Sequence, residues 1–281
     1  VISSGRHMDT APQFTLDIYS PHTTSTSEED DSLLSYRSNY RKHLPDKVDQ
    51  IEALVAGTDA ERLDTLKRLY VKCYHLAGTS STFGAPTGSS EAGKMVHLLQ
   101  PLIQESGEVT DDMVIALQES IHALRQAALS ESALPPEHDT RIYPVEKMLG
   151  MAQPRAELFL VDSDEDFSTY IRMYLEQLGH RVYAFDSPAD LLLASRGIQP
   201  KAILIDLVQQ EDEVEGTRVI REIMRHHPMK IPVLFMSYRD DLEARLLATS
   251  AQGSYFVKKP VHEERLLMIL EGTLDLKIHN V

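Results

Sequence analysis

The sequence predicts two domains in series: an all-helical bundle, then an α/β domain with a doubly wound, five-stranded parallel sheet. Two observations predict this order. From residue 33 to 130, apolar residues recur at three- and four-residue spacing, which is the period of an amphipathic helix. From residue 156 to 276, five short apolar runs alternate with helical stretches. Strict alternation of strand and helix favours an open parallel sheet covered by helices on both faces.

The segments outside these two domains are predicted to be irregular. The first eight residues, VISSGRHM, are typical of the remnant of a cleaved expression tag, and the polar stretch that follows completes a tail over 1–32. Residues 131–155 contain four prolines and are predicted to be a linker. Residues 277–281 are predicted to be a C-terminal tail.

The bundle is predicted to contain only helices, joined by short connections, because no alternating strand pattern occurs in it. Asp59 and Thr110 precede apolar periodic runs and have side chains suited to N-caps. The expected helices cover 32–44, 46–57, 59–83, 89–106 and 110–129.

In the second domain, runs of Ile, Leu, Val and Phe predict buried strands, and the stretches between them show helical spacing. The expected strands are 156–162, 181–185, 201–207, 231–237 and 254–260. The expected helices are 165–179, 188–197, 215–227, 240–251 and 262–276.

Composition limits the partners. The formal net charge of -15 argues against nonspecific binding to nucleic acid or to an anionic membrane, since both prefer basic surfaces. No run of about 18 apolar residues occurs, so we expect no membrane-spanning helix. The single cysteine, Cys73, excludes an intrachain disulfide and favours a reducing compartment, the cytoplasm.

Four polar side chains end the predicted strands: Asp162, Asp206, Ser237 and Lys259. In an open parallel sheet, ligands bind beyond the carboxyl ends of the strands, so we expect these side chains to meet at one edge. A buried carboxylate without a partner is costly, and Asp206 should therefore lie at the rim with a cation or other partners. Carboxylates suit Mg²⁺, and the whole set suits transfer of a phosphoryl group onto Asp206.

The second domain resembles the receiver domain of response regulators, a flavodoxin-like fold. The resemblance covers roughly 156–276 and is carried in order by FLVDSDED, AILIDL, PVLFMS and YFVKKP. It implies that Asp206 is the phosphoacceptor, Ser237 the switch hydroxyl and Lys259 the lysine that binds the phosphoryl group. It also implies that Phe256 is the switch aromatic residue and that the carbonyl group of Val208 is a metal ligand.

Two departures from the receiver pattern concern the metal. Receivers usually carry an acidic pair after the first strand, whereas this chain has Asp162 followed by Ser163. Asp164 is the residue that could compensate, so the expected Mg²⁺ ligands are Asp162, Asp164, Asp206 and Val208. The loop after Asp206 is also longer and more acidic than the family pattern, which puts the affinity for Mg²⁺ in question.

The helical domain resembles histidine phosphotransfer (HPt) domains through YHLAGTSSTFG and SEAGKMVHLL. Aligning Leu76 to Gly78 with that family places Tyr74, not His75, at the phosphoacceptor position, with Gly78 giving room one turn later. His75 is rotated by about 100° around the helix. It is either a displaced phosphoacceptor or an exposed polar residue of a domain that has lost its chemistry, and the second alternative is preferred. The bundle is then a docking or dimerising element with Tyr74 on its contact face.

These resemblances imply a phosphorelay response regulator, a phosphoprotein that a sensor histidine kinase or a phosphotransfer protein phosphorylates and that acts on an output domain or effector. The alternative is an interaction scaffold that works without phosphate. A small-molecule hydrolase with Asp206 as nucleophile is a third class, less favoured because no cap insertion is visible. Receivers behind phosphotransfer-like domains often precede a diguanylate cyclase, so the chain as a regulatory fragment of such an enzyme stays open. Formation of a homodimer also stays open.

Overall fold

The computed structural model describes residues 33–56, 63–104, 110–134, 155–207, 213–226, 231–239, 245 and 254–274. Asp31–Val281 form one compact unit, so the helical and sheet regions are described together. The expected tag remnant, both tails and most of the linker lie outside the described residues. So do Asp59 and most of the helix expected over 240–251.

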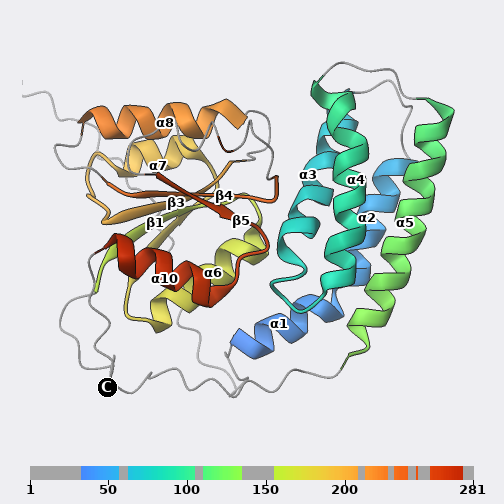
Figure 1. The fold of residues 1–281 in the computed structure, drawn as a ribbon, viewed down its shortest axis with the longest axis horizontal. Coiled ribbons are helices and arrows are strands. Elements are labelled where there is room, and N and C mark those ends of the chain that lie inside the picture. Colours follow the sequence, from blue (N-terminus) through green and yellow to red (C-terminus); the bar gives the residue numbers. More distant parts are fainter. Residues whose placement is uncertain are drawn as a thin grey trace, which may run out of the picture. The chain divides into compact units, whose positions relative to one another are not determined.

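The described part of the bundle contains five helices, as the periodicity predicts (Figure 1). Helix α3 packs against α4, α4 against α5, and α5 against α2. The core of the bundle contains Leu69, Cys73, Met95 and Leu99, which are fully buried or nearly so. The helices are α1 (Leu33–Lys42), α2 (Leu44–Ala56), α3 (Leu63–Thr79), α4 (Pro86–Gln104) and α5 (Asp111–Ser132).

Two helix starts show what local sequence can and cannot indicate. Thr110 is the N-cap of α5, as predicted, and its hydroxyl accepts the N–H of Met113. Helix α4 begins at Pro86, earlier than predicted, because Glu131 of α5 accepts the N–H groups of Thr87 and Gly88 at 2.7 and 2.9 Å. That carboxylate satisfies helix N–H groups from 43 residues away, so no local cap signals this start.

The five predicted strands are confirmed, and all pair in parallel. The strand order is β2-β1-β3-β4-β5, the doubly wound arrangement in which the order reverses between β1 and β3. The central strands β1, β3 and β4 are almost wholly buried, which explains their continuous apolar sequences. The strands are β1 (Glu157–Val161), β2 (Arg181–Phe185), β3 (Ala202–Asp206), β4 (Val233–Ser237) and β5 (Ser254–Lys258).

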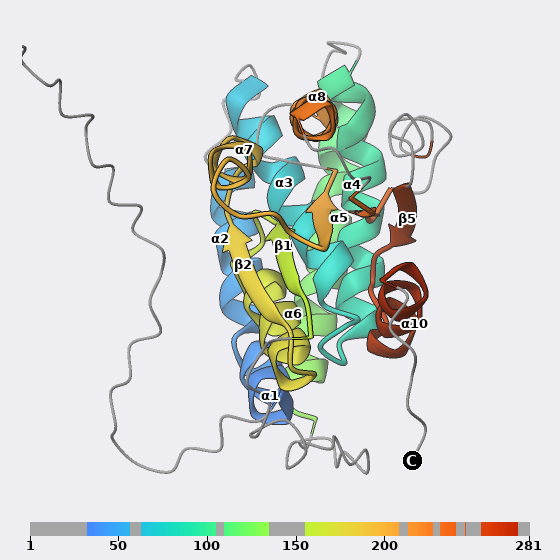
Figure 2. The same cartoon turned by 90° about the vertical axis from the view of Figure 1, so that its left-hand side faces the viewer.

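Helices cover both faces of the sheet: α6 and α10 lie on one face, and α7 and α8 on the other (Figures 1 and 2). Alternate residues of β1 divide between the two cores, since Leu158 and Leu160 face α6 while Phe159 and Val161 belong to the α7–α8 side. The helices are α6 (Glu165–Gln177), α7 (Pro188–Ala194), α8 (Glu213–His226) and α10 (Glu263–Thr273).

The bundle and the sheet domain share an aromatic core. Phe83, in the turn after α3, stacks on Tyr40 at 4.2 Å between ring centroids and meets Tyr170 of α6 edge-on at 4.9 Å. Tyr36 packs against both Phe83 and Tyr170. Phe83 and Tyr170 are fully buried or nearly so, and the buried cluster that contains them runs from the bundle to the α6–α10 face of the sheet. The bundle is therefore packed on the sheet domain through apolar burial as well as polar contacts.

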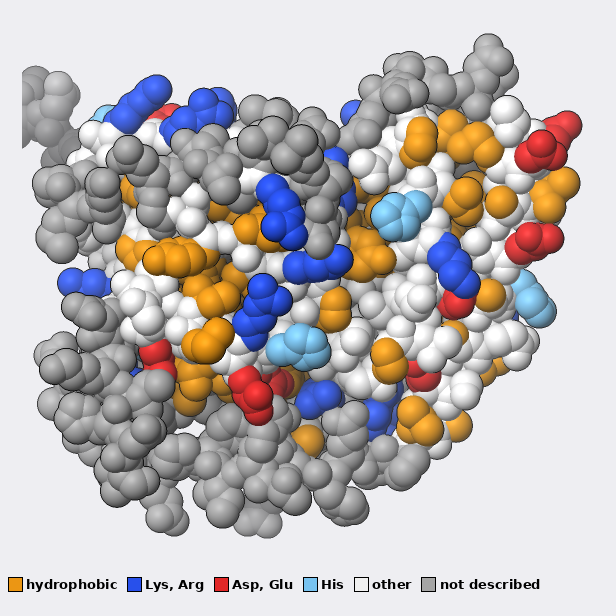
Figure 3. All heavy atoms as spheres, in the orientation of Figure 1, with side chains coloured by type: hydrophobic (Ala, Val, Ile, Leu, Met, Phe, Trp, Pro, Cys, Tyr) orange, Lys and Arg blue, Asp and Glu red, His pale blue; other side chains and the backbone are white. Residues whose placement is uncertain are grey.

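On the face drawn in Figure 3, Lys and Arg side chains gather near the middle, while Asp and Glu side chains are scattered. On this face the described basic side chains are therefore clustered, whereas the described acidic side chains are not. Among the described helices, none is both long and apolar enough to cross a bilayer.

Candidate functional site

The parallel strands bring the predicted polar side chains together at their carboxyl edge. Asp206 and Ser237 are the last residues of β3 and β4, while Asp162 and Lys259 directly follow β1 and β5. All four are buried, and Asp206 and Ser237 are 0% exposed. The expectation that Asp206 lies at the rim with partners is half right, because it lies at the strand end but is covered.

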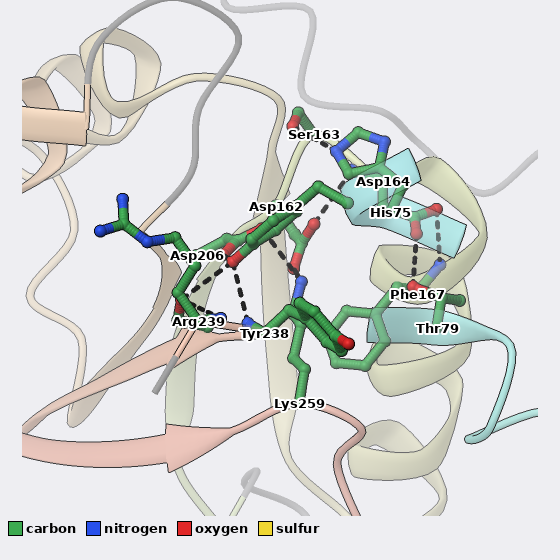
Figure 4. A network of polar contacts seen from close by, with 12 residues as sticks. His75, Thr79, Asp162, Ser163, Asp164, Phe167, Asp206, Tyr238, Arg239 and Lys259 are labelled. Atoms are coloured by element: carbon green, nitrogen blue, oxygen red, sulfur yellow. Dashed lines mark hydrogen bonds and ion pairs between the residues drawn. The ribbon is translucent and has the colours of Figure 1, made fainter. Parts of the chain in front are cut away.

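Lys259 joins the two carboxylates. Its Nζ lies 2.7 Å from Oδ2 of Asp162 and 3.0 Å from Oδ2 of Asp206, and 4.3 Å from the centre of the Phe167 ring (Figure 4). Burial lowers the pKa of Lys259, but the two carboxylates raise it by more, so the ammonium stays charged. Burial raises the pKa of Asp162 despite Lys259.

The contact between Tyr74 and Asp206, which the sequence patterns did not predict, comes from the bundle. Tyr74 of α3 is 0% exposed and places its hydroxyl 3.1 Å from Oδ1 of Asp206 and 3.0 Å from Oγ of Ser237. The backbone N–H of Tyr238 donates to the same phenolic oxygen at 3.0 Å. Three groups of the sheet edge thus converge on one oxygen of the bundle.

Donors and acceptors in this network fit one assignment. An ionised carboxylate only accepts, so the hydroxyl of Tyr74 donates to Asp206. The oxygen of Tyr74 accepts from Tyr238 N–H and from the hydroxyl of Ser237, whose own oxygen accepts the N–H of Arg239 at 3.1 Å. Burial and the nearby Asp206 raise the pKa of Tyr74 well above its usual value, so the phenol keeps its proton.

Asp164 has a structural position beside this network. Its Oδ1 accepts the N–H of Phe167, which makes it the N-cap of α6, and Oδ2 accepts the hydroxyl of Thr79 at 2.5 Å. Its own N–H donates to Oδ1 of Asp162 at 3.0 Å. Burial would raise the pKa of Asp164, but His75 and the hydrogen bond from Thr79 outweigh it and lower that pKa.

His75 is not an exposed residue, and the preferred expectation for it was wrong in this respect. It is half-buried, and its Nε2 lies 3.1 Å from Oγ of Ser163 (Figure 4). The rotation around α3 that separates it from Tyr74 directs it to the β1–α6 turn instead of Asp206. Burial lowers the pKa of His75, so the ring is predominantly neutral at pH 7.

Two glycines of the bundle allow this close approach. A Cβ atom at Gly78 of α3 would lie 3.0 Å from Cδ of Lys259, and one at Gly93 of α4 would lie 1.9 Å from the hydroxyl oxygen of Tyr238. Both helices therefore contact the sheet edge through positions without a side chain. The room predicted at Gly78 is filled by a lysine of the same chain.

The carboxylates do not fit a divalent cation in this arrangement. Each carboxylate oxygen of Asp162, Asp164 and Asp206 receives a hydrogen bond or an ion pair from a protein group. No cluster of three or more His, Cys, Asp or Glu side chains suited to a metal occurs among the described residues. The expected ligand Val208 lies outside them. The structure thus groups the predicted acids without forming the predicted Mg²⁺ site.

Phe256 of β5 lies apart from the hydroxyl network. It packs, partly buried, against the α7–α8 core, with the guanidinium of Arg245 5.5 Å from its ring centre. The sequence predicted no role for the Tyr238 N–H or for Thr79, and it predicted Asp164 as a metal ligand and not as the N-cap of α6. Only the last had a local signal, an Asp directly before the helical run that starts at Glu165.

Comparison with known proteins identifies the second half of the chain. The model of the response regulator receiver domain matches residues 158–271. A curated relative, an uncharacterized 76.5 kDa protein of Thiocystis violacea, is 27% identical over 186 residues, which is 66% of this chain and 26% of that protein. Residues 156–281 number fewer than 186, so this similarity extends into the amino-terminal half.

Two further comparisons each cover less than half of this chain. The nitrogen assimilation regulatory protein NtrX of Azorhizobium caulinodans is 25% identical over 119 residues, 42% of this chain and 26% of that protein. The solved receiver domain of a sensor histidine kinase from Pseudomonas aeruginosa, which has a magnesium ion in its active site cleft, is 23% identical with a TM-score of 0.38, covering 43% of this chain and 98% of that one. The chain spans about a quarter of the length of both curated relatives.

Proposed function

We propose that residues 158–271, which match the model of the response regulator receiver domain, accept a phosphoryl group on Asp206, which makes this chain the signal-receiving part of a phosphorelay response regulator. One observation carries the proposal. The ammonium of Lys259 bridges Asp162 and Asp206 at the carboxyl edge of the sheet, with the hydroxyl of Ser237 in the same network. A cation and a hydroxyl beside a carboxylate supply the charge neutralisation and positioning on which phosphoryl transfer depends.

The reacting oxygen in this proposal is Oδ1 of Asp206, because Oδ2 is bound to Lys259. Oδ1 attacks the phosphorus of the donor, a new P–O bond forms, and the donor leaves with the electron pair of the broken bond. Lys259 and Ser237 bind oxygens of the transferred group. Mg²⁺ is the proposed cofactor once the hydroxyls of Tyr74 and Thr79 no longer bind Asp206 and Asp164. Asp162, Asp164 and Asp206 would then hold the ion, which would neutralise phosphoryl charge.

We further propose that the bundle is an HPt-like domain without its phosphoacceptor. Support comes from Tyr74, which projects from α3 toward the receiver's Asp206, the direction in which a phosphoacceptor histidine would have to point. His75 instead contacts Ser163. The proposed donor is a sensor histidine kinase or a separate phosphotransfer protein, and the proposed recipient of the signal is an output domain or effector protein in the cytoplasm. A diguanylate cyclase output stays one candidate.

The test is mass spectrometry of the full chain after incubation with Mg²⁺ and a small phosphodonor such as acetyl phosphate. We expect the mass of one phosphoryl group on the peptide that contains Asp206, and none in Asp206→Asn. Asp190→Asn is the matched control, because Asp190 lies on α7 in a local hydrogen bond with Ser187. Equal modification of Asp206→Asn and the parent would refute the assignment.

A second candidate function is that of an interaction scaffold that works without phosphate. The observation that favours it is the complete burial of Asp206 beneath Tyr74. A scaffold of this kind would bind its partners equally in the parent and in Asp206→Asn, and neither would gain mass from any phosphodonor.

A further inference from the structure

We infer that Tyr74 and Thr79 of α3 close the receiver site of their own chain, so that neither a divalent cation nor a phosphodonor reaches Asp206 until α3 withdraws. The inference adds a regulatory device to the proposed function and rests on it in part. It treats the bundle as an inhibitor that binds in place of the reactants.

The first argument is the identity of the atoms that α3 contacts. The hydroxyl of Tyr74 binds Oδ1 of Asp206, and the hydroxyl of Thr79 binds Oδ2 of Asp164. These oxygens belong to two of the carboxylates that could ligate a cation. Hard cations need such oxygens directly, and a hydrogen-bond donor on each of them competes for the same lone pairs.

The second argument is space. Only a hydrogen-bonding distance of 3.1 Å separates the oxygen of Tyr74 from Oδ1 of Asp206. A phosphoryl group on Oδ1 would need room there for its phosphorus and three oxygens. A donor must also approach Oδ1 in line with the new bond, and the hydroxyl of Tyr74 lies in contact with that oxygen. The phenolic oxygen accepts from Ser237 and from Tyr238 N–H, so it uses the donors that a phosphoryl oxygen would use.

The third argument is charge. Asp162, Asp164 and Asp206 are three carboxyl groups buried close together, and the ammonium of Lys259 contacts two of them. Neighbouring buried acids favour a nearby cation, so the site retains an attraction for one that the hydroxyl groups do not supply. Withdrawal of α3 would remove the Tyr74 hydroxyl from Oδ1 of Asp206 and the Thr79 hydroxyl from Oδ2 of Asp164 together. The closed and cation-bound states therefore compete.

The fourth argument is that this contact depends on small residues at defined positions. Gly78 lets α3 approach Lys259, and Gly93 lets α4 approach Tyr238. A larger side chain at Gly78 would have to displace a lysine that two carboxylates hold. Replacing Gly78 therefore offers a second way to open the site, independent of the tyrosine.

The test compares the full chain with Tyr74→Ala, which removes the phenol, and with Tyr255→Ala as control. Tyr255 lies on β5 and is 45% exposed, outside the network. One readout is stabilisation by millimolar Mg²⁺ in thermal unfolding, which reports binding to the folded state. The other is the initial rate of mass gain from acetyl phosphate.

We expect Mg²⁺ to bind Tyr74→Ala at least about tenfold more tightly than the parent or Tyr255→Ala, a difference of about 1.4 kcal/mol, with a similar gain in phosphorylation rate. Equal Mg²⁺ affinity and equal rate in parent and Tyr74→Ala would overturn the inference. The two proposals fail separately. Tighter Mg²⁺ binding by Tyr74→Ala without any mass gain would support closure by α3 but refute Asp206 as the phosphoacceptor. Equal phosphorylation of Tyr74→Ala and the parent would support Asp206 as the phosphoacceptor but refute closure by α3.

Gly78→Leu covers the case in which Tyr74→Ala does not fold. Its readout is hydrogen exchange of the Tyr238 amide, which donates to Tyr74 in the closed state. We expect at least about tenfold faster exchange at this amide than in the parent, together with the gain in Mg²⁺ affinity. Faster exchange without any gain in Mg²⁺ affinity would also overturn the inference.

Discussion

The phenolic oxygen of Tyr74 lies 3.1 Å from Oδ1 of Asp206, although the two residues are 132 positions apart in the chain. In the proposed function, the tyrosine takes the position of an HPt phosphoacceptor and the aspartate is the phosphoacceptor of the receiver. The contact between them is a hydrogen bond between two buried side chains. The following predictions test this relationship and its surroundings.

Removing only the hydroxyl of Tyr74 should destabilise the chain. Tyr74→Phe leaves Oδ1 of Asp206 and the N–H of Tyr238 without their buried partner, at a cost of about 1 to 3 kcal/mol in the free energy of unfolding. Urea denaturation measures this cost. Tyr255→Phe, at an exposed site, should change stability by less than about 0.5 kcal/mol. Equal effects of the two substitutions would mean that the Tyr74 hydroxyl contributes nothing.

Removing the buried ammonium should cost more. Lys259→Met removes the ammonium that joins Asp162 and Asp206, and we expect a loss of about 3 to 5 kcal/mol in urea denaturation. Adding Asp162→Asn and Asp206→Asn removes both charges and should restore most of that loss. A triple variant no more stable than Lys259→Met would show that the ion pairs are not the cause.

A carboxylate at position 163 should act on His75. Ser163→Asp places a negative charge near Nε2, which now lies 3.1 Å from the serine hydroxyl, so the pKa of His75 should rise by about one unit or more. NMR titration of the imidazole measures it. Ser163→Ala supplies no charge and should leave the pKa low, because burial is its main cause. A low pKa in Ser163→Asp would place the new carboxylate away from the ring.

Tyr74→His should turn the contact into a relay. Imidazole is shorter than phenol, so a phosphoryl group on Asp206 would have room beside it, within the distance of about 3 to 3.5 Å that in-line attack requires. After loading with acetyl phosphate, we expect acid-labile, base-stable phosphate on α3 in this variant only. Tyr74→Gln is the control without a nucleophilic ring. Such phosphate on His75 in the parent would instead make His75 an active relay residue.

Stability should depend on pH through His180, a buried residue that is not part of the site. Burial, with Arg155 nearby, lowers its pKa to about 4, and neither ring nitrogen has a hydrogen-bond partner in the described part of the chain. In the unfolded chain the pKa of His180 is about 6.5, so the unfolded state binds the proton first as the pH falls. The free energy of unfolding should therefore decrease by up to about 3 kcal/mol as the pH is lowered from 6.5 to 4. His180→Phe should flatten this part of the stability profile, and an identical profile would exclude His180 as its source.

The sequence by itself determined the elements and the gathering of the strand-end residues. Periodicity distinguishes helices from strands because burial of one face imposes it locally, and five strands in β-α alternation leave little choice of architecture. Parallel strands end at one edge, so Asp162, Asp206, Ser237 and Lys259 had to meet there. The N-cap Thr110 could also be predicted, because its signal lies in the residues that directly follow it.

Tertiary structure alone decided what covers that edge. Tyr74 lies on a helix with its own apolar pattern, and nothing near it in sequence indicates that its partners are Asp206, Ser237 and Tyr238. The start of α4 at Pro86 depends likewise on Glu131 of another helix. Local patterns record which face of an element is buried, whereas the partner on that face is selected by shape, by small residues such as Gly78 and by the pairing of buried polar groups.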